Sequence, residues 1–153
     1  MRGSLCLTGN ERSVAALQAR IDASPADVGL QEIRVDALEH VDDALFEFLS
    51  TIAPRAVVTC RPVAEGGAFT GSEAERLQLL ARAAGLGVAW VDVELSAVEA
   101  GGLPEALRPG RAGGARVLVS VHAHEPDGDA VPGLVKRLNR VPSAGAKLAL
   151  QVR

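Results

Sequence analysis

The sequence predicts an α/β protein of the (β/α)8-barrel type, here an incomplete barrel of about six parallel βα units. Two observations predict this class. Short runs rich in Val, Leu and Ile alternate with longer amphipathic runs, and the short runs begin about 20–35 residues apart, as βα units do. The chain has 153 residues, whereas a closed eight-stranded barrel needs at least about 200. We therefore expect a single barrel domain over residues 1–153, truncated at its C-terminal end. A doubly wound sheet is the alternative.

The individual elements follow from this alternation. Six apolar runs predict strands at Leu5–Thr8, Val28–Val35, Ala56–Arg61, Val88–Leu95, Arg116–His122 and Lys147–Val152. Apolar residues three or four positions apart, and a capping box that begins at Ser72, predict helices at Val14–Ile21, Leu45–Leu49, Ser72–Gly85 and Val131–Leu138. The connection from Ser96 to Gly114 is interrupted by prolines and glycines, so only short helical turns are expected there.

Composition excludes several classes of protein. A net charge of −3 and an aromatic content of 3%, with no tyrosine, argue against a nucleic-acid partner. No apolar run is long enough to cross a membrane, and the N-terminus lacks the apolar stretch of a signal peptide. Cys6 and Cys60 form neither a disulfide framework nor a metal-binding spacing. We therefore expect a cytoplasmic protein that binds neither nucleic acid nor membrane.

Charged side chains cluster where the second and third predicted strands end, which is where α/β folds place their sites. Glu32, Arg34 and Asp36 share one face of the second strand, and they form either a structural Glu–Arg pair or part of a site. Arg61 ends the third strand, and Glu65 follows on a glycine-rich loop. An arginine in this place either clamps a substrate carboxylate or phosphate or pairs with its own loop.

The next two strands add acidic residues and histidines. Asp92 and Glu94 share a face with Trp90, and we expect them to pair inside the protein. His122, at the tip of the fifth strand, is either a general acid–base group or a satisfied core histidine. His122 and His124 form only a weak metal signal, so no metal site is predicted without a third ligand.

A lysine in the sixth strand is unusual in this chain. Lys136 and Lys147 are its only lysines, and Lys147 is flanked by small and apolar residues. Burial disfavours the charged form of a lysine, and this is how Schiff-base amines become nucleophilic. The alternative is a lysine that extends to solvent at a sheet edge.

Taken in chain order, these motifs resemble the type I 3-dehydroquinate dehydratase family. They are Glu-x-Arg-x-Asp, Thr-Cys-Arg-Pro with Glu-Gly-Gly, Val-Asp-Val-Glu, Ser-x-His and Lys-x-Ala, and the closest stretches are Glu32–Glu39, Val58–Gly67, Val91–Leu95 and Ser120–His122. The resemblance covers almost the whole chain. It implies a (β/α)8 barrel and a hydro-lyase of the shikimate pathway of aromatic amino acid biosynthesis, which dehydrates 3-dehydroquinate to 3-dehydroshikimate through a lysine Schiff base.

The resemblance also implies a role for each of six residues. Lys147 forms the imine with the substrate ketone. His122 removes the C2 proton and assists loss of the C1 hydroxyl, and Glu65 hydrogen-bonds this histidine. Glu32 and Arg34 bind the substrate hydroxyls, and Arg61 lies near the substrate. Because a protonated imine is an electron sink, imidazole suffices as the base, and neither a metal nor another cofactor is needed. The oligomeric state does not follow from the sequence, and a homodimer stays open.

Two departures from the family pattern leave alternatives open. The family lysine follows Gly-Ala-Asp-x-x-Lys, whereas Gly145–Ala146 directly precedes Lys147 here. Either Lys147 or Leu150 therefore occupies the lysine position, and the run that begins at Lys147 favours the former. The family's seventh and eighth strands also have no counterpart.

Three hypotheses explain why the seventh and eighth strands of the family have no counterpart here. The chain is a fragment of a longer protein, a degenerate and non-catalytic member, or a barrel completed by another chain. A different Schiff-base barrel, such as an aldolase, is disfavoured by the Thr-Cys-Arg and Glu-Gly-Gly motifs.

Overall fold

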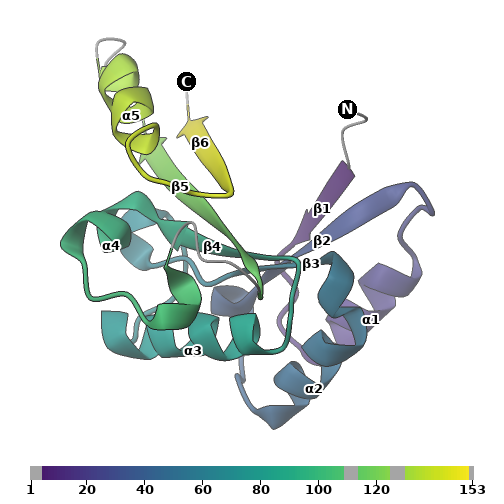
Figure 1. Ribbon diagram of the computed structural model, residues 1–153. Coiled ribbons are helices and arrows are strands. Elements are labelled where there is room, and N and C mark those ends of the chain that lie inside the picture. Colours follow the sequence, from purple (N-terminus) through teal and green to yellow (C-terminus); the bar gives the residue numbers. More distant parts are fainter. Residues whose placement is uncertain (1–4, 109–113, 125–129, 152–153) are drawn as a thin grey trace.

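The computed structural model describes residues 5–108, 114–124 and 130–151, which contain one sheet of six parallel strands in chain order. The strands are β1 (Leu5–Gly9), β2 (Val28–Arg34), β3 (Ala56–Thr59), β4 (Trp90–Glu94), β5 (Arg116–His124) and β6 (Gly145–Gln151). The sheet curls, so that β1 and β6 stand on opposite arms of the molecule (Figure 1). A doubly wound sheet reverses its strand order at a switch point. The sequential order excludes that alternative and confirms the predicted barrel-type arrangement.

Helices follow the strands, and most of them lie on the outer side of the curl (Figure 1). They are α1 (Val14–Asp22), α2 (Asp43–Ile52), α3 (Glu73–Gly85), α4 (Leu95–Ala100) and α5 (Ala130–Leu138), with 3₁₀ turns at Val35–Ala37, Ala53–Arg55, Val63–Glu65 and Glu105–Leu107. The predicted capping box is present, because Glu75 N–H donates to Ser72 Oγ at 3.3 Å and Ser72 N–H donates to Glu75 Oε2 at 2.8 Å. Across the described ranges, each helix is too short or too polar to span a bilayer.

Two strands end earlier than the sequence predicts, for one shared reason. β2 ends at Arg34 rather than Val35, because the chain turns there and brings Asp36 back toward β3. β3 ends at Thr59 rather than Arg61, because the Arg61 N–H donates to Asp36 Oδ1 at 3.0 Å instead of joining the ladder. The following residue is a proline, which has no N–H to donate. The Asp36 carboxylate, which closely follows β2 and lies 25 positions from Arg61, thus bonds at both strand ends.

The later strands shift by one or two residues. β4 begins at Trp90 rather than Val88, since the Ala89 N–H leaves the ladder and donates to the Ala53 carbonyl at 2.8 Å. β5 continues to His124 because its residues from Leu118 onward stay in register with the whole of β6. β6 begins at Gly145, two residues before the prediction, and Val152 lies outside the described residues.

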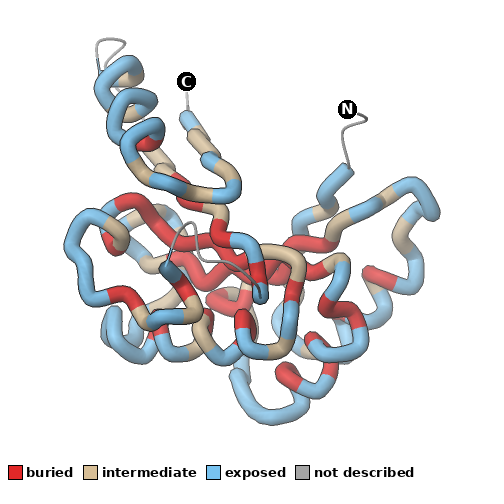
Figure 2. Tube along the Cα trace, viewed as in Figure 1, coloured by how far each residue is buried: buried red, intermediate tan, exposed pale blue. Residues whose placement is uncertain are grey.

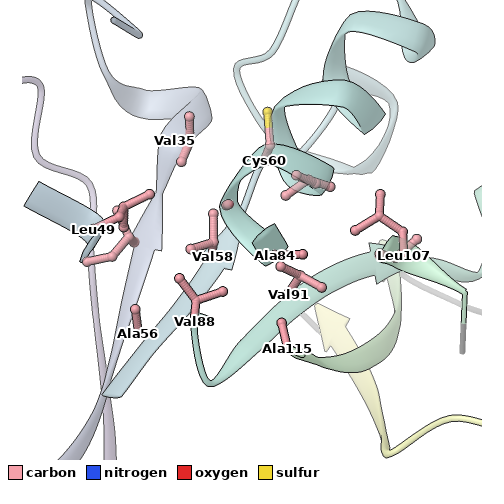
Figure 3. Packing of buried hydrophobic residues seen from close by; sticks show 14 of the residues in the cluster. Val35, Leu49, Ala56, Val58, Cys60, Ala84, Val88, Val91, Leu107 and Ala115 are labelled. Carbon is pink, nitrogen blue, oxygen red and sulfur yellow. The ribbon is translucent and has the colours of Figure 1, made fainter. Parts of the chain in front are cut away.

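The hydrophobic core lies between the outer face of the sheet and the helices (Figure 2). Alternate strand residues point outward and are fully buried there, among them Ile33, Val58, Val91, Val93 and Val119. They pack with helix residues into one cluster, part of which Figure 3 shows around Val58, Val91 and Ala84. The core therefore uses one face of the sheet and leaves the other for function.

The side chains of the inner face fall into three layers along the strands, because strand side chains alternate between the two faces of the sheet. The layer nearest the amino ends is apolar and comprises Cys6, Leu30, Val57, Trp90 and Leu118. The middle layer is polar and comprises Thr8, Glu32, Thr59, Asp92, Ser120 and Lys147. The layer at the carboxyl ends contains Arg34, Arg61, Glu94 and His122. Polarity thus rises toward the edge where the predicted site lies.

Candidate active site

All six residues predicted to form the site line one cavity at the carboxyl ends of the strands. Its volume is about 370 Å³, and its lining includes Glu32, Arg34, Arg61, Glu65, His122 and Lys147. A second, largely apolar cavity of about 420 Å³ lies against the apolar layer and shares Thr8, Glu32 and Lys147 with the first. Lys147 therefore stands at the border between a polar and an apolar space.

Lys147 points into the curl although β6 is the last strand of the described sheet. Its Nζ lies 3.5 Å from Glu32 Oε1 and 3.6 Å from Asp92 Oδ2, and 34% of its side chain is exposed. The alternative of a lysine extended into solvent at the sheet edge does not describe this geometry. Leu150 also lines the polar cavity, but its side chain carries no amine and is 39% exposed.

His122, on the strand next to that of Lys147, forms a pair with Glu65 in the lining of the same cavity. The backbone N–H of His122 donates to Glu65 Oε2 at 3.3 Å, and the ring atom Nδ1 lies 3.4 Å from the same oxygen. Burial alone would raise the pKa of Glu65, but the contacts with His122 and the charge of Arg61 outweigh it and hold this pKa below its ordinary value. An ionised carboxylate thus faces one side of the imidazole.

Two glycines allow the loop after β3 to place Glu65. Gly66 has φ = 77°, in the left-handed region that favours glycine, and closes the turn at Val63–Glu65. A Cβ atom on Gly67 would lie 2.0 Å from the Arg61 carbonyl oxygen, so any side chain would displace the loop. The Glu-Gly-Gly motif is therefore explained by backbone geometry.

Glu32 and Arg34 neighbour each other along β2 but have different partners. Glu32 accepts hydrogen bonds from Thr8 Oγ1 at 2.6 Å and Thr59 Oγ1 at 2.7 Å. Burial alone would raise the pKa of Glu32, yet these bonds and the charge of Lys147 keep it below its ordinary value. Arg34 instead makes a bidentate pair with Asp36. Within the described part of the chain no ion pair joins Glu32 to Arg34, so the alternative of a structural Glu–Arg pair is wrong.

Arg61 lies beneath the cavity and is 3% exposed. Its Nη1 donates to Glu94 Oε1 at 2.8 Å and to Ser120 Oγ at 2.9 Å, and its Nη2 donates to Asp92 Oδ2 at 2.7 Å. Contact with its own loop is weaker, because Glu65 Oε2 lies 3.9 Å away. The predicted internal pairing of Asp92 and Glu94 is confirmed, and their partner is Arg61.

Several residues around the site were not singled out from the sequence. Thr8 and Thr59 orient Glu32, and their inward position could have been read from the period of two. Arg76 of α3 is 1% exposed, pairs with Glu94 and donates to the Cys60 carbonyl at 3.0 Å. An arginine on a helix normally indicates a solvated face, so no local pattern pointed to the burial of Arg76. Among the described residues, no group of three or more His, Cys, Asp and Glu is arranged to hold a metal ion. The His124 side chain lies outside what the structure describes.

The curled parallel sheet, with a lysine between two carboxylates and a histidine–glutamate pair in one cavity, defines a (β/α)-barrel protein with a lysine-centred site. Comparison with known families narrows this class. The chain belongs to the type I 3-dehydroquinase family, whose sequence model matches residues 5–151. The resemblance drawn from the motifs is therefore confirmed.

Curated relatives agree with this family. The 3-dehydroquinate dehydratase of Desulfotalea psychrophila is 36% identical over 96 residues, which cover 62% of this chain and 41% of that protein. The 3-dehydroquinate dehydratase of Dehalococcoides mccartyi is 34% identical over 114 residues, which cover 73% of this chain and 48% of that protein. The chain thus spans less than half the length of these two relatives.

Solved structures agree with the fold. The 3-dehydroquinate dehydratase of Geobacillus kaustophilus superposes with a TM-score of 0.73 at 21% identity, covering 96% of this chain and 61% of that one. The type I enzyme of Clostridium difficile gives 0.69 at 20% identity, covering 97% and 63%. The six strands described here are therefore a curled half-barrel of the predicted type.

Proposed function

We propose that this chain carries the Schiff-base site of a 3-dehydroquinate dehydratase of the shikimate pathway, which converts 3-dehydroquinate to 3-dehydroshikimate. The observation that carries the proposal is the position of Lys147. Its amine shares a polar cavity with the His122–Glu65 pair, so a nucleophile and an acid–base group face one bound molecule. The family, and the names of its relatives, supply the substrate.

Each step uses a residue of this cavity. The Lys147 amine adds to the C3 ketone, and water leaves as the imine forms. The protonated imine draws electrons from C2, so His122 removes a C2 proton with the electron pair held in the enamine. Collapse of the enamine expels the C1 hydroxyl, which His122 protonates, and water leaves. Hydrolysis of the product imine returns the Lys147 amine.

The other predicted residues position the substrate and the base. Glu65 fixes the orientation of the His122 ring. Glu32 and Arg34 stand on the cavity wall, where carboxylate and guanidinium groups can bind the hydroxyls of the substrate. Arg61 contributes its positive charge from below, since most of its donors are already bonded.

Borohydride trapping tests this proposal. The protein is mixed with 3-dehydroquinate and sodium borohydride, then analysed by intact mass and peptide mapping. We expect one reduced adduct on the Lys147 peptide. Lys136 of α5 offers a matched control, because it is the only other lysine and is exposed. Lys136→Arg should keep the adduct and Lys147→Arg should lose it; an adduct that persists in Lys147→Arg contradicts the proposal.

A second function is favoured by the two edge strands of the described sheet, β1 and β6. In the described sheet β1 and β6 each pair on one side only, and an apolar cavity lies between them. Unpaired strand edges and exposed apolar surface are features of association. The chain would then be a non-catalytic barrel fragment that assembles with another chain, for which a homodimer is the simplest form. Light scattering tests it, and a dilute monomer with full dehydratase activity would contradict it. For the enzymatic function we propose a cytoplasmic location, as expected from the sequence.

A further inference from the structure

Asp92 lies directly beneath the amine of Lys147 and is not exposed at all. It belongs to β4, two strands away from β6 in the sheet, and reaches the lysine only because the sheet curls. Glu32 is the other carboxylate near this amine, but its side chain is 10% exposed at the cavity wall. The two carboxylates therefore differ in their access to solvent.

Two hydrogen bonds hold the Asp92 carboxylate in place, and a third joins their two donors. Its Oδ2 accepts from Arg61 Nη2 at 2.7 Å, and its Oδ1 accepts from the Ser120 hydroxyl. The Ser120 oxygen in turn accepts from Arg61 Nη1 at 2.9 Å. Since these partners come from the segments on both sides of β4, the carboxylate cannot turn away from Lys147 without breaking buried hydrogen bonds.

Arg61 does not bond to Asp92 alone. The same guanidinium also donates to Glu94, which Arg76 pairs from the other side. The buried cluster thus holds two arginines and two carboxylates, and Lys147 adds a nitrogen whose charge can change. A buried carboxylate at 3.6 Å favours the positive form of that nitrogen.

We propose that Asp92 is the buried counter-ion of Lys147 and sets the protonation of its nitrogen, first in the free amine and then in the substrate imine. The part that concerns the imine rests on the function proposed above. The Lys147 ammonium releases a proton to solvent before its amine adds to the ketone, the imine nitrogen takes up a proton again as water leaves, and Asp92 forms no bond to carbon. Its charge stabilises the protonated imine, which is the form that accepts electrons from C2.

Competitive labelling of the two lysines tests the counter-ion without substrate. The protein is treated with trace acetic anhydride over a range of pH, and labelling at Lys147 and Lys136 is measured by peptide mass spectrometry. In Asp92→Asn we expect the midpoint of Lys147 labelling to move to lower pH by about one unit. Lys136, exposed on α5, should keep its midpoint and serves as the internal reference. The Asp92→Asn variant leaves the other titratable and charged residues that line the cavities around Lys147 unchanged. They are Cys6, Glu32, Arg34, Arg61, Glu65 and His122.

Glu94→Gln is the matched control. It also removes a buried carboxylate of β4 that is bonded to Arg61, but Glu94 makes no ion pair with Lys147 among the described contacts. We expect its Lys147 midpoint to move clearly less than that of Asp92→Asn. Equal shifts in the two variants, or an unmoved Lys147 midpoint in Asp92→Asn, would overturn the proposal.

Folding is checked by circular dichroism in every variant. If Asp92→Asn does not fold, Asp92→Ser replaces it, because serine still offers Arg61 an acceptor while removing the charge, and the same shift is expected. Asp92→Glu keeps the charge and should restore most of the wild-type midpoint.

A second readout separates this inference from the proposed function. With 3-dehydroquinate and borohydride, Asp92→Asn should still give a trapped Lys147 adduct, while its single-turnover dehydration falls about 100- to 1000-fold, as for loss of one preorganised electrostatic contact. A wild-type protein that gives no adduct would refute the Schiff-base function. The labelling shift would then still decide whether Asp92 sets the charge of the Lys147 amine.

Discussion

At the scale of single residues, Asp36 stands out next to the cavity because its carboxylate accepts four hydrogen bonds. Its carboxylate accepts from Arg34 Nε at 2.9 Å and Nη2 at 2.6 Å, from the Arg61 N–H at 3.0 Å and from the Ala68 N–H at 3.1 Å. Burial by itself would raise the pKa of Asp36, but these four donors outweigh it and keep this pKa below its ordinary value. One side chain thus orients Arg34 and anchors the loop that presents Glu65.

Removing the charge of Asp36 should lower the stability of the folded chain. We expect Asp36→Asn to lower the free energy of unfolding by about 3 kcal/mol or more at neutral pH, because it leaves a partly buried guanidinium and a backbone donor without their acceptor. Asp43→Asn is the matched control, since Asp43 pairs with Arg82 at the surface, where its side chain is 83% exposed. Its effect should stay within about 1 kcal/mol. Urea unfolding of the three proteins measures both values.

The sign of the pH dependence follows from the lowered pKa of Asp36. Its contribution is fully present above the unfolded value of about 3.9 and is lost as the pH falls through the lower folded value. The stability difference between wild type and Asp36→Asn should therefore shrink as the pH drops below about 4. A difference that stays constant down to pH 3 would show that the charge of Asp36 is not what stabilises the fold.

Local motifs were enough to find most side chains of the cavity, because charged residues at strand ends stand out against apolar strands. Contacts across the curl were not predictable in this way. Asp92 and Lys147 meet only after the three strands β4, β5 and β6 have been laid side by side, and nothing in either local sequence encodes that distance. Arg76 was missed because its burial depends on Glu94, a residue of another element.

At the scale of elements, the loop after β3 sets the geometry of the acid–base pair. We expect Gly67→Ala to displace this loop, since the new methyl group would meet the Arg61 carbonyl, and Glu65 should then leave His122. The ring signals of His122 in a proton NMR spectrum should shift in this variant. The chain has three histidines, so the signal can be assigned by substitution.

Gly133→Ala is the control for this change. Gly133 lies in α5, and a Cβ atom there would have open space within 4 Å. The substitution should stabilise the helix by up to about 1 kcal/mol and leave the His122 signals unmoved. Unchanged His122 signals in a folded Gly67→Ala protein would mean that the loop does not depend on this glycine.

Element types were predictable because each one has a local cause, such as the capping box of α3 or the apolar run of β3. The end of β3 was less predictable, because it depends on the bond from the Arg61 N–H to Asp36, an acceptor 25 positions away in the sequence. The sequence contains both residues of this bond but not their proximity.

At the scale of the whole molecule, the inner face is a surface that association would cover. Trp90 is the only tryptophan and lines the apolar cavity, with Arg116 stacked 4.1 Å from its ring centroid. If copies of the chain cover this face, Trp90 emission moves to shorter wavelength as the protein concentration rises, because the ring leaves water. We expect this shift together with an increase in mass by light scattering.

Leu5→Lys provides the control for association. Leu5 is 59% exposed on β1, at one edge of the described sheet, and a lysine on a strand edge discourages pairing with another strand. The emission shift should be weaker in this variant. A wild-type spectrum and mass that do not change with concentration would argue against association through the inner face.

The fold class was predictable from the number and spacing of the apolar runs, which is a property of the whole sequence. The state of association was not, because surface-exposed apolar residues are common in single chains and gain meaning only when the structure groups them. Cys6, Leu30 and Trp90 lie far apart in sequence and form one apolar layer only in the curled sheet.

The cluster around Arg61 also bears on how this interior would respond to redesign. Buried ion pairs are often replaced by apolar residues with no loss of stability. Arg61, Asp92 and Glu94 form one bonded set next to Lys147. Replacing all three by apolar residues of similar volume should therefore leave the fold intact, whereas removing one alone would leave a charge buried without its partner.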